Sequence, residues 1–332
     1  MSKKNWSFTN IWNETLLQRE EREVKSRSHL WASELGKAPI DLYLRLNGVK
    51  ETNPPNKRSF RKFEAGNIWE WIASLILIRA GILIKEQEHL SHQYEGLLEV
   101  TGRLDFLAGG KPDYKKADEE LEKLLLPEIF LKAGKNIVEY FKKNYPDGLE
   151  EKVIEIKSTS AFMFEVYKKS GRASDNHMKQ CFHYMKAKNM KRGAVIYICR
   201  DDCRMLEFQI LNPSWIEDEY KKDIETITKF YNENVEPPKA EYILFENGRF
   251  TKNWRVEYSG YLTMLYDFKE PADFADYCKP KTARWNRVLG RIVRNEKMTE
   301  KNLLAIEEIN EWGFDLKKCV AESKKANMLN KK

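Results

Sequence analysis

The sequence predicts an α/β fold, with a mixed central sheet flanked by helices, a helical insertion and a helical C-terminal extension. Short β-branched segments such as Val153–Ser158 alternate with longer helical stretches, which is the succession expected of a sheet covered by helices. Between two of the predicted strands, residues 109–151 carry apolar side chains at helical spacing. Residues 280–297, near the C-terminus, carry arginines at helical spacing, which predicts a helix there.

The N-terminal part is expected to be helical. Residues 7–28 predict a highly charged helix, and residues 39–46 predict a short helix that ends at Gly48. Residues 51–57, with two consecutive prolines, form a connection. A long helix then spans residues 59–79, with Ser59 as its N-cap and Gly81 as its stop.

The central part contains the predicted sheet. The strands expected from β-branched and alternating segments are residues 82–89, 94–100, 101–108, 152–158, 194–199 and 204–211. Helices are expected over residues 174–189 and 215–233. In the C-terminal part, Thr299 caps a helix that runs to Trp312, and residues 317–332 are expected to be a polar tail. The chain is therefore divided into residues 1–58, 59–235 and 236–332.

Composition narrows the class of protein. The 332 residues carry a net charge of +7, which permits nucleic-acid binding without diagnosing it. The most apolar stretch, residues 71–84, is interrupted by Arg79 and Gly81, so no membrane crossing is expected. Five cysteines, an odd number, favour a reduced cytoplasmic protein. Cys199 and Cys203 flank a predicted turn and have no second pair nearby, so a core or loop role is favoured over zinc.

The strand Val153–Ser158 is the most informative segment. Its period of two places Glu155 and Lys157 on one face and Ile154 and Ile156 on the other. A carboxylate that can hold a divalent cation, beside a fixed positive charge, suits the hydrolysis of a phosphodiester. On its own, such a pair is more often a solvated ion pair than part of a metal site. The metal-site interpretation therefore requires other acids that converge on the pair.

Further side chains of the required types occur in order along the chain. Glu70 lies in the middle of the long predicted helix, and Asp105 lies on the polar face of the strand 101–108. Gln180 and Tyr184 are four residues apart, so they share one helical face. Glu70 could equally be a solvent-exposed helix acid, and Tyr184 a core aromatic with a satisfied hydroxyl.

This order of motifs resembles the PD-(D/E)XK nuclease superfamily, and in particular its RecB-like exonuclease branch, which includes the exonucleases of CRISPR adaptation. The similarity covers roughly residues 29–261, with residues 32–37, 42–45 and 63–67 resembling the segment that precedes the first acid in that branch. The resemblance implies a restriction-endonuclease-like core.

The resemblance also implies roles for individual residues. Asp105, Glu155, the backbone carbonyl of Ile156 and Glu70 would bind Mg²⁺ or Mn²⁺ through oxygen ligands. Lys157 would position or deprotonate the attacking water. Gln180 and Tyr184 would hold the active-site geometry or the DNA backbone.

The chain departs from the iron–sulfur members of this branch. Ala38, Val256 and Ser259 stand where thiolate ligands would be expected, and the cysteines present do not replace them, so no iron–sulfur cluster is expected. We expect packing around Trp254, Tyr258 and Tyr261 to join the chain ends instead.

Two further segments carry hypotheses about binding. Four arginines recur at i, i+3, i+7 and i+10 on the helix 280–297, where phosphate contact is favoured over a solvated face: Arg284, Arg287, Arg291 and Arg294. The insertion 109–151 could be extra core, a lid over a substrate channel, or the contact of a homo-oligomer or a protein partner.

The sequence thus predicts a Mg²⁺- or Mn²⁺-dependent deoxyribonuclease acting on DNA, and specifically an end-dependent exonuclease of repair, recombination, or phage or mobile-element DNA processing. The alternative is a catalytically inactive or complex-dependent nucleic-acid-binding protein on the same fold.

Overall fold

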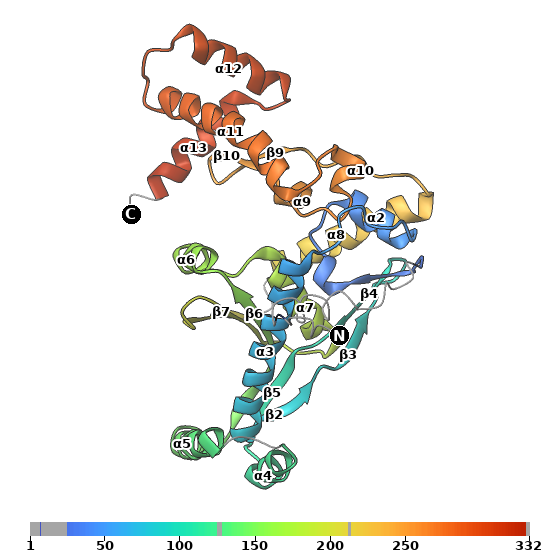
Figure 1. The fold of residues 1–332 in the computed structure, drawn as a ribbon, viewed down its shortest axis with the longest axis vertical. Helices are drawn as coiled ribbons and strands as arrows, with labels where there is room; N and C mark the ends of the chain where they lie inside the picture. The colour runs from blue at the N-terminus through green and yellow to red at the C-terminus, as the bar shows by residue number, and fades with distance from the viewer. Residues whose placement is uncertain (1–6, 8–24, 125–127, 212–213, 330–332) are drawn as a thin grey trace, which may run out of the picture. The chain divides into compact units, whose positions relative to one another are not determined.

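The computed structural model describes residues 7, 25–124, 128–211 and 214–329 (Figure 1). The helix expected over residues 7–28 falls almost entirely outside these described residues. The chain forms two compact units. The first contains Met1–Gly36, Leu46–Gly48 and Pro55–Val235, and the second contains Lys37–Arg45, Val49–Pro54 and Glu236–Lys332.

A five-stranded mixed sheet organises the first unit, as the sequence predicted. Its strands follow the order β2-β5-β6-β7-β8, with bounds Leu83–Glu86, Phe106–Gly110, Leu149–Thr159, Gly193–Cys199 and Met205–Ile210. The pair β6 and β7 is parallel, and the other neighbours are antiparallel. The strand that carries Glu155 and Lys157 is therefore central and has a partner on each side.

Helices cover both faces of this sheet (Figure 1). Helix α3 (Lys57–Arg79) packs Trp69, Ala73 and Leu77 against a cluster that includes Ile154 and Ile156. Helix α7 (Asp175–Ala187) covers the opposite face and buries most of its residues, and α8 (Ser214–Glu233) packs on α7. Alternation along β6 thus sends its isoleucines towards α3 and leaves Glu155 and Lys157 on the other face.

The boundaries of α3 differ slightly from the prediction. Its N-cap is Asn56, whose side-chain oxygen accepts a hydrogen bond from the N–H of Ser59 at 3.0 Å, so the assignment of Ser59 as the cap was wrong. The helix ends at Arg79, and Gly81 follows with a φ of +69°. This left-handed conformation explains the glycine at the stop.

The expected strand 101–108 is two strands in different sheets. Strands β1 (His29–Trp31), β4 (Glu99–Arg103) and β3 (His89–His92) form a three-stranded sheet in the order β1-β4-β3. The chain leaves this sheet at Arg103 and joins the central sheet at Phe106. Leu104 is fully buried at the junction, so the apolar pattern continues across the break and conceals it.

Two other strand predictions near this break, for residues 82–89 and 94–100, were wrong at their bounds. The strand expected over residues 82–89 is divided between β2 and β3, because it pairs with both halves of the divided segment. Residues 94–98 form a turn, in which the N–H of Leu97 donates to the carbonyl of Tyr94, and β4 begins only at Glu99. Helix α6 (Ala161–Ser170), capped by Ser160, was not predicted.

The insertion is helical, as predicted. Helix α4 (Tyr114–Glu122) and helix α5 (Glu128–Asn144) lie between β5 and β6, and both pack against α3. Asp113 caps α4 by accepting a hydrogen bond from the N–H of Lys116 at 3.0 Å. The insertion therefore extends the helical layer on the α3 side of the sheet.

The second unit is mostly helical. It contains most of α2 (Pro39–Leu46), a hairpin of β9 (Ile243–Glu246) and β10 (Arg249–Lys252), and the helices α9 (Trp254–Glu257), α10 (Leu262–Tyr266), α11 (Pro271–Val293), α12 (Glu300–Glu311) and α13 (Leu316–Leu329). Helix α11 begins nine residues before the predicted start and includes Pro280 in its interior. The polar tail expected from residue 317 is instead α13, because Cys319 and Ser323 are buried on one side of it.

Among the described residues, no helix combines the length and the hydrophobicity that crossing a membrane would require.

Candidate active site

Strand β6 carries a buried ion pair at its centre. The Glu155 side chain is 0 % exposed, and its Oε1 atom is in contact with Nζ of Lys157, which remains 25 % exposed. Oε2 of Glu155 is buried and has no hydrogen-bond partner among the described residues. Burial raises the pKa of Glu155, since the lysine offsets the loss of solvation only in part. One oxygen of this carboxylate is therefore available to a ligand.

Asp105 reaches the same point from the junction between β4 and β5. Its Oδ2 atom accepts a hydrogen bond from the N–H of Ile156 at 2.8 Å. Ile154, two residues earlier, pairs with Phe106, the first residue of β5. The N–H and C=O groups of Ile156 therefore face the β5 side of the strand, just beyond the last pair with β5. The carboxylate of Asp105 and the carbonyl oxygen of Ile156 thus lie at one edge of β6.

The two buried acids and the lysine influence one another's pKa. Burial, and then repulsion from Glu155, raise the pKa of Asp105 to about 7. Partial burial lowers the pKa of Lys157, but attraction to Glu155 and Asp105 outweighs this effect and raises it overall. The lysine therefore keeps its positive charge at neutral pH.

Glu70 projects from the middle of α3. Burial and the nearby charge of Asp105 raise the pKa of its half-buried carboxyl group. Gln87 holds it in place, with Nε2 donating a hydrogen bond to Oε2 of Glu70 at 3.3 Å. Gln87 has a φ of +51°, an uncommon value for a residue with a side chain, and its N–H donates to the carbonyl of Asp105.

Gln180 and Tyr184 come from one face of α7, as predicted. Nε2 of Gln180 donates a hydrogen bond to the hydroxyl of Tyr184 at 3.3 Å. Burial raises the pKa of Tyr184, so the phenol stays protonated. A Cβ atom at Gly102, three residues before Asp105, would lie 2.8 Å from the Tyr184 hydroxyl, so the close approach of Tyr184 explains the glycine at this position.

Five of the six predicted catalytic side chains line one cavity of about 510 Å³: Glu70, Asp105, Lys157, Gln180 and Tyr184. Glu155 does not line the cavity, but it is paired with Lys157, which does. Arg103 was not among the predicted residues. It lines the same cavity and lies close enough to Glu70 and Asp105 to oppose the rise in their pKa. Its place two residues before Asp105 is a signal that could have identified it.

The donors of this site suit a hard divalent cation. No cluster of three or more His, Cys, Asp or Glu side chains in the described part of the chain forms a ready metal centre. The two carboxylates, however, repel each other, and one oxygen of Glu155 is buried without a hydrogen-bond partner. Oxygen donors of this kind favour Mg²⁺ or Mn²⁺, and a cation between them would remove the repulsion.

A pH dependence of stability follows from the raised pKa of Asp105. A carboxyl group with a raised pKa in the folded protein stabilises it below the ordinary pKa, near 4, and this contribution is lost as pH rises through about 7. Without divalent cations, the free energy of unfolding should therefore fall between pH 5 and 7.5. Urea titrations at several pH values, in EDTA, give the free energy of unfolding of the wild type and of Asp105→Asn. If this free energy changed equally with pH in both proteins, the result would contradict the prediction.

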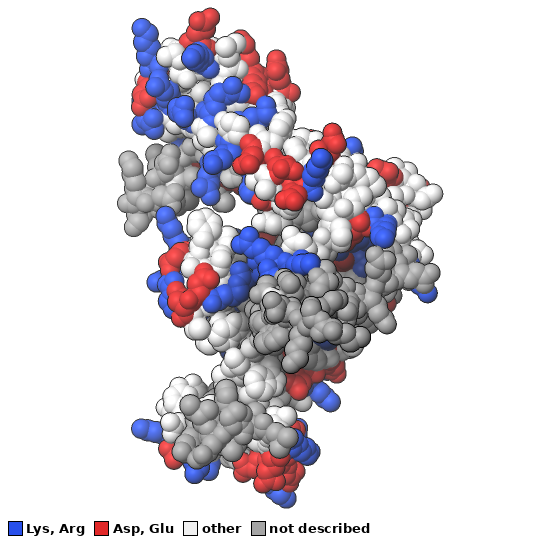
Figure 2. All heavy atoms as spheres, in the orientation of Figure 1, with Lys and Arg blue, Asp and Glu red and all other residues white. Residues whose placement is uncertain are grey.

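A cluster of cations at the start of α3 was not predicted. Arg58 and Lys62 of α3 lie near Arg200, whose N–H donates to the carbonyl of Thr159 at the end of β6. Partial burial and the two arginines lower the pKa of Lys62, and no acid forms an ion pair with these three residues in the described part of the chain. Lys and Arg side chains gather over this end of α3 (Figure 2).

Most of the four arginines on helix α11 of the second unit lie next to glutamates, which their spacing in the sequence did not indicate. Arg284 forms an ion pair with Glu308, and Arg294 forms one with Glu296 at 2.5 Å. Arg291 lies 3.9 Å from the same Glu296. Arg287 is exposed and has no ion pair with the described residues. The proposed phosphate contact therefore depends most directly on Arg287.

The positions compared with cluster cysteines lie in the core of the second unit. Ala38 and Val256 are buried there. The Ser259 hydroxyl donates a hydrogen bond to Oδ1 of Asp41 at 2.9 Å, and the Tyr261 hydroxyl donates to the carbonyl of Val49 at 2.8 Å. Tyr258 is 66 % exposed, so the prediction that it packs between the chain ends was wrong.

No family model matches the chain, and no curated protein matches its sequence. Solved structures with a similar course of the chain include one described as SSO0001, at 14 % identity and a TM-score of 0.40, covering 67 % of this chain and 87 % of that one. They also include the alkaline exonuclease LHK-Exo from Laribacter hongkongensis, at 13 % identity and a TM-score of 0.38, covering 68 % and 94 %. Its complex with dAMP gives 14 % and 0.40 over the same shares.

Proposed function

We propose that this protein is a Mg²⁺- or Mn²⁺-dependent DNA nuclease of the PD-(D/E)XK type, RecB-like, that removes nucleotides from DNA ends. The observation that carries the proposal is the convergence of three groups on the middle of β6: Asp105 bonds to the N–H of Ile156, and Lys157 pairs with the buried Glu155. Asp105 and Lys157 line one cavity together with Glu70, Gln180 and Tyr184. We propose DNA repair, recombination, or phage or mobile-element DNA processing as its setting.

The acidic residues of the site would supply the ligands of the cation that hydrolysis requires. Asp105, Glu155, the carbonyl of Ile156 and Glu70 would hold the cation. When bound, it would polarise the phosphoryl group and lower the pKa of water. In the net reaction a water oxygen forms a bond to phosphorus, the bond from phosphorus to the leaving oxygen breaks, and one proton of the water passes to the leaving oxygen.

Lys157, Gln180 and Tyr184 would act on the charge of the phosphate. The Lys157 ammonium is fixed beside Glu155, so it can orient the attacking water and offset negative charge as it develops. Its raised pKa favours these roles over deprotonation of water. The Tyr184 hydroxyl accepts from Gln180, which leaves its own proton available for a phosphate oxygen.

The alternative is a nucleic-acid-binding protein that has lost activity or acts only within a complex. The unpaired oxygen of Glu155 favours an active enzyme, because burial of a charge without compensation is costly unless a ligand uses it. Incubation of the purified protein with end-labelled single- and double-stranded DNA and Mg²⁺ or Mn²⁺ tests the choice. DNA binding without cleavage under every metal condition would favour the alternative.

End dependence is a separate prediction. We propose that the insertion 109–151 closes a channel that admits only a strand end, and we therefore expect linear DNA to be degraded much faster than covalently closed circles of the same sequence. Time courses on both substrates, with nicked circles as a control for local opening, measure the ratio. Rapid cutting of closed circles would show an endonuclease with an open cleft.

The arginine helix supplies another prediction. If Arg287 contacts a phosphate, Arg287→Gln should weaken DNA binding independently of sequence and reduce the log–log salt slope by roughly one unit. Arg294→Gln is the matched control, because Arg294 is already paired with Glu296. Anisotropy titrations at several salt concentrations give the slopes. An unchanged slope for Arg287→Gln would assign this helix to the solvated surface.

A further inference from the structure

Three cations lie together at the N-terminal end of α3, and we call them the α3 cation cluster: Arg58, Lys62 and Arg200. Arg58 and Lys62 are four residues apart, so they share one face of the helix, and both are exposed. Arg200 follows β7, and its N–H donates to the carbonyl of Thr159 at 2.8 Å, which fixes its backbone at the end of β6. Partial burial and then the two arginines lower the pKa of Lys62, so both arginines lie within electrostatic reach of it.

The stability of the folded chain does not explain the α3 cation cluster. Like charges four residues apart on a helix repel each other, and the helix dipole disfavours cations near the N-terminus. The first turn of α3 nevertheless contains no acid, and it includes Arg58. Arg204, four residues after Arg200, forms ion pairs with Asp202 and Glu165, whereas no acid in the described part of the chain pairs with a member of the cluster. Positive charge without a partner is typical of a surface that binds phosphate.

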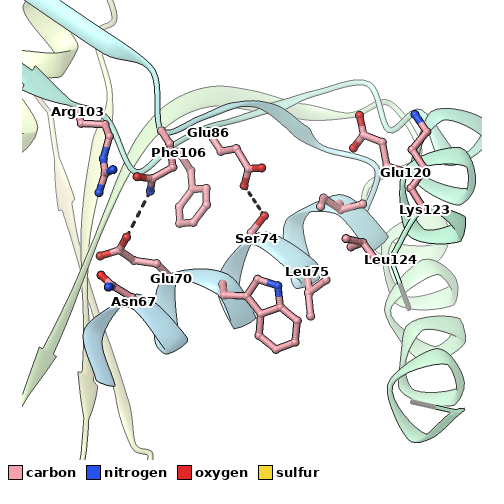
Figure 3. Close-up of a pocket in the computed structure, with 13 residues that line it drawn as sticks. Asn67, Glu70, Ser74, Leu75, Glu86, Arg103, Phe106, Glu120, Lys123 and Leu124 are labelled. Atoms are coloured by element: carbon pink, nitrogen blue, oxygen red, sulfur yellow. Dashed lines mark hydrogen bonds between the residues drawn. The ribbon is translucent and has the colours of Figure 1, made fainter. Parts of the chain in front are cut away.

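The α3 cation cluster and the active site lie along the same helix. Lys62 precedes Glu70 by two helical turns, which is a rise of about 12 Å. The turn between them packs on β6, because a Cβ atom at Gly66 would lie 3.8 Å from the Ser158 hydroxyl. The side chain of Asn67, which is exposed, lies beside that of Glu70 (Figure 3). A strand that leaves the active site and follows α3 towards its N-terminus would therefore reach the cluster.

We propose that the α3 cation cluster binds a backbone phosphate of the DNA strand that is being cut, about three to four nucleotides from the reacting bond. The spacing follows from the rise of about 12 Å along α3, because a stacked strand advances about 3.4 Å per nucleotide. This inference rests on the proposed nuclease function and deepens it. The cluster would contribute to affinity for the strand, whereas the residues on β6 would carry out the chemistry.

Binding to DNA in EDTA tests the cluster without requiring cleavage. Lys62→Gln and Arg200→Gln should each reduce the log–log salt slope by roughly 0.7–0.9 unit, and the double variant by about twice as much. The melting temperature should not fall, because neutralisation relieves repulsion within the cluster. Arg192→Gln is the matched control: Arg192 immediately precedes β7, at the opposite end of that strand from Arg200, and is paired with Glu150 at 2.8 Å. Unchanged slopes for the cluster variants, or an equal change in the control, would overturn the proposal.

A scan of neutral linkages locates the phosphate. One methylphosphonate linkage, which removes one negative charge, is placed at successive positions along an oligonucleotide. The wild type should lose about tenfold in affinity at an internal position about three to four linkages from one end, and the Lys62→Gln/Arg200→Gln variant should not respond there. A wild type that responds only to removal of a terminal phosphate would overturn the proposal.

Cleavage in Mg²⁺ or Mn²⁺ separates failure of this proposal from failure of the nuclease function. The double variant should raise KM for DNA about tenfold and leave kcat nearly unchanged, because the cluster would act on binding alone. An active wild type without a sensitive internal linkage would overturn the cluster assignment and leave the nuclease function intact. An inactive wild type whose DNA binding still depends on Lys62 and Arg200 would overturn the nuclease function and support the cluster.

Discussion

Glu155→Gln is expected to reduce DNA cleavage by at least about 1,000-fold, because the substitution removes a negative charge from the proposed cation site. The amide is nearly isosteric with the carboxylate, and the side chain is fully buried, so packing should be preserved.

The matched control for this variant is Glu207→Gln. Glu207 lies on β8 of the same sheet, is 43 % exposed and forms an ion pair with Lys152 at 2.7 Å. We expect near-normal cleavage from it. Single-turnover rates with saturating Mg²⁺ or Mn²⁺, together with DNA affinity, separate chemistry from binding. Near-normal cleavage by Glu155→Gln would remove this site from the mechanism.

Lys157→Met is expected to reduce cleavage by about 100-fold while leaving cation binding as strong as before, or stronger. The substitution removes the charge proposed to offset the phosphate, but it also removes a cation that competes for Glu155. The increase in melting temperature on adding Mn²⁺ should therefore persist in Lys157→Met and be reduced in Glu155→Gln.

Strand β6 supplies a control for the lysine as well. Lys152 lies on the same strand and is paired with a glutamate, but it does not line the cavity, so Lys152→Met should cleave DNA normally. Lys157→Arg should recover part of the activity, because it restores the charge with a different geometry. Loss of Mn²⁺ stabilisation in Lys157→Met would instead indicate a structural role for this lysine.

The central sheet could be predicted because its strands obey local patterns. Residues 153–158 alternate, and residues 194–199 form a continuous apolar run bounded by turns, which is typical of a strand buried on both faces. The division at Leu104 could not be predicted, because a buried leucine fits both an uninterrupted strand and a crossing between sheets. Only the pairing partners of residues 89–92 and 106–110 distinguish them.

The residues of the candidate site also fall into two groups: those that local spacing predicts and those that only the fold brings together. The acids and the lysine were found because their spacing along the chain is informative, and Gln180 and Tyr184 because they are four residues apart on a helix. The contact of Gln87 with Glu70 and the cluster at Arg200 depend on segments that meet only after folding. The pairing of Arg284 with Glu308, 24 residues away on another helix, was invisible for the same reason.

The second unit is built from two distant parts of the chain, and this has a consequence during synthesis. Val49 and Tyr261, whose hydrogen bond helps to close the unit, are 212 residues apart. At roughly 5–20 residues per second, the ribosome needs about 10–40 s to make the intervening chain. Throughout that interval Ile40 and Leu44 lack the apolar partners from α9, α10 and α11 that later bury them. We therefore expect the N-terminal segment of this unit to bind a chaperone that holds apolar segments on nascent chains.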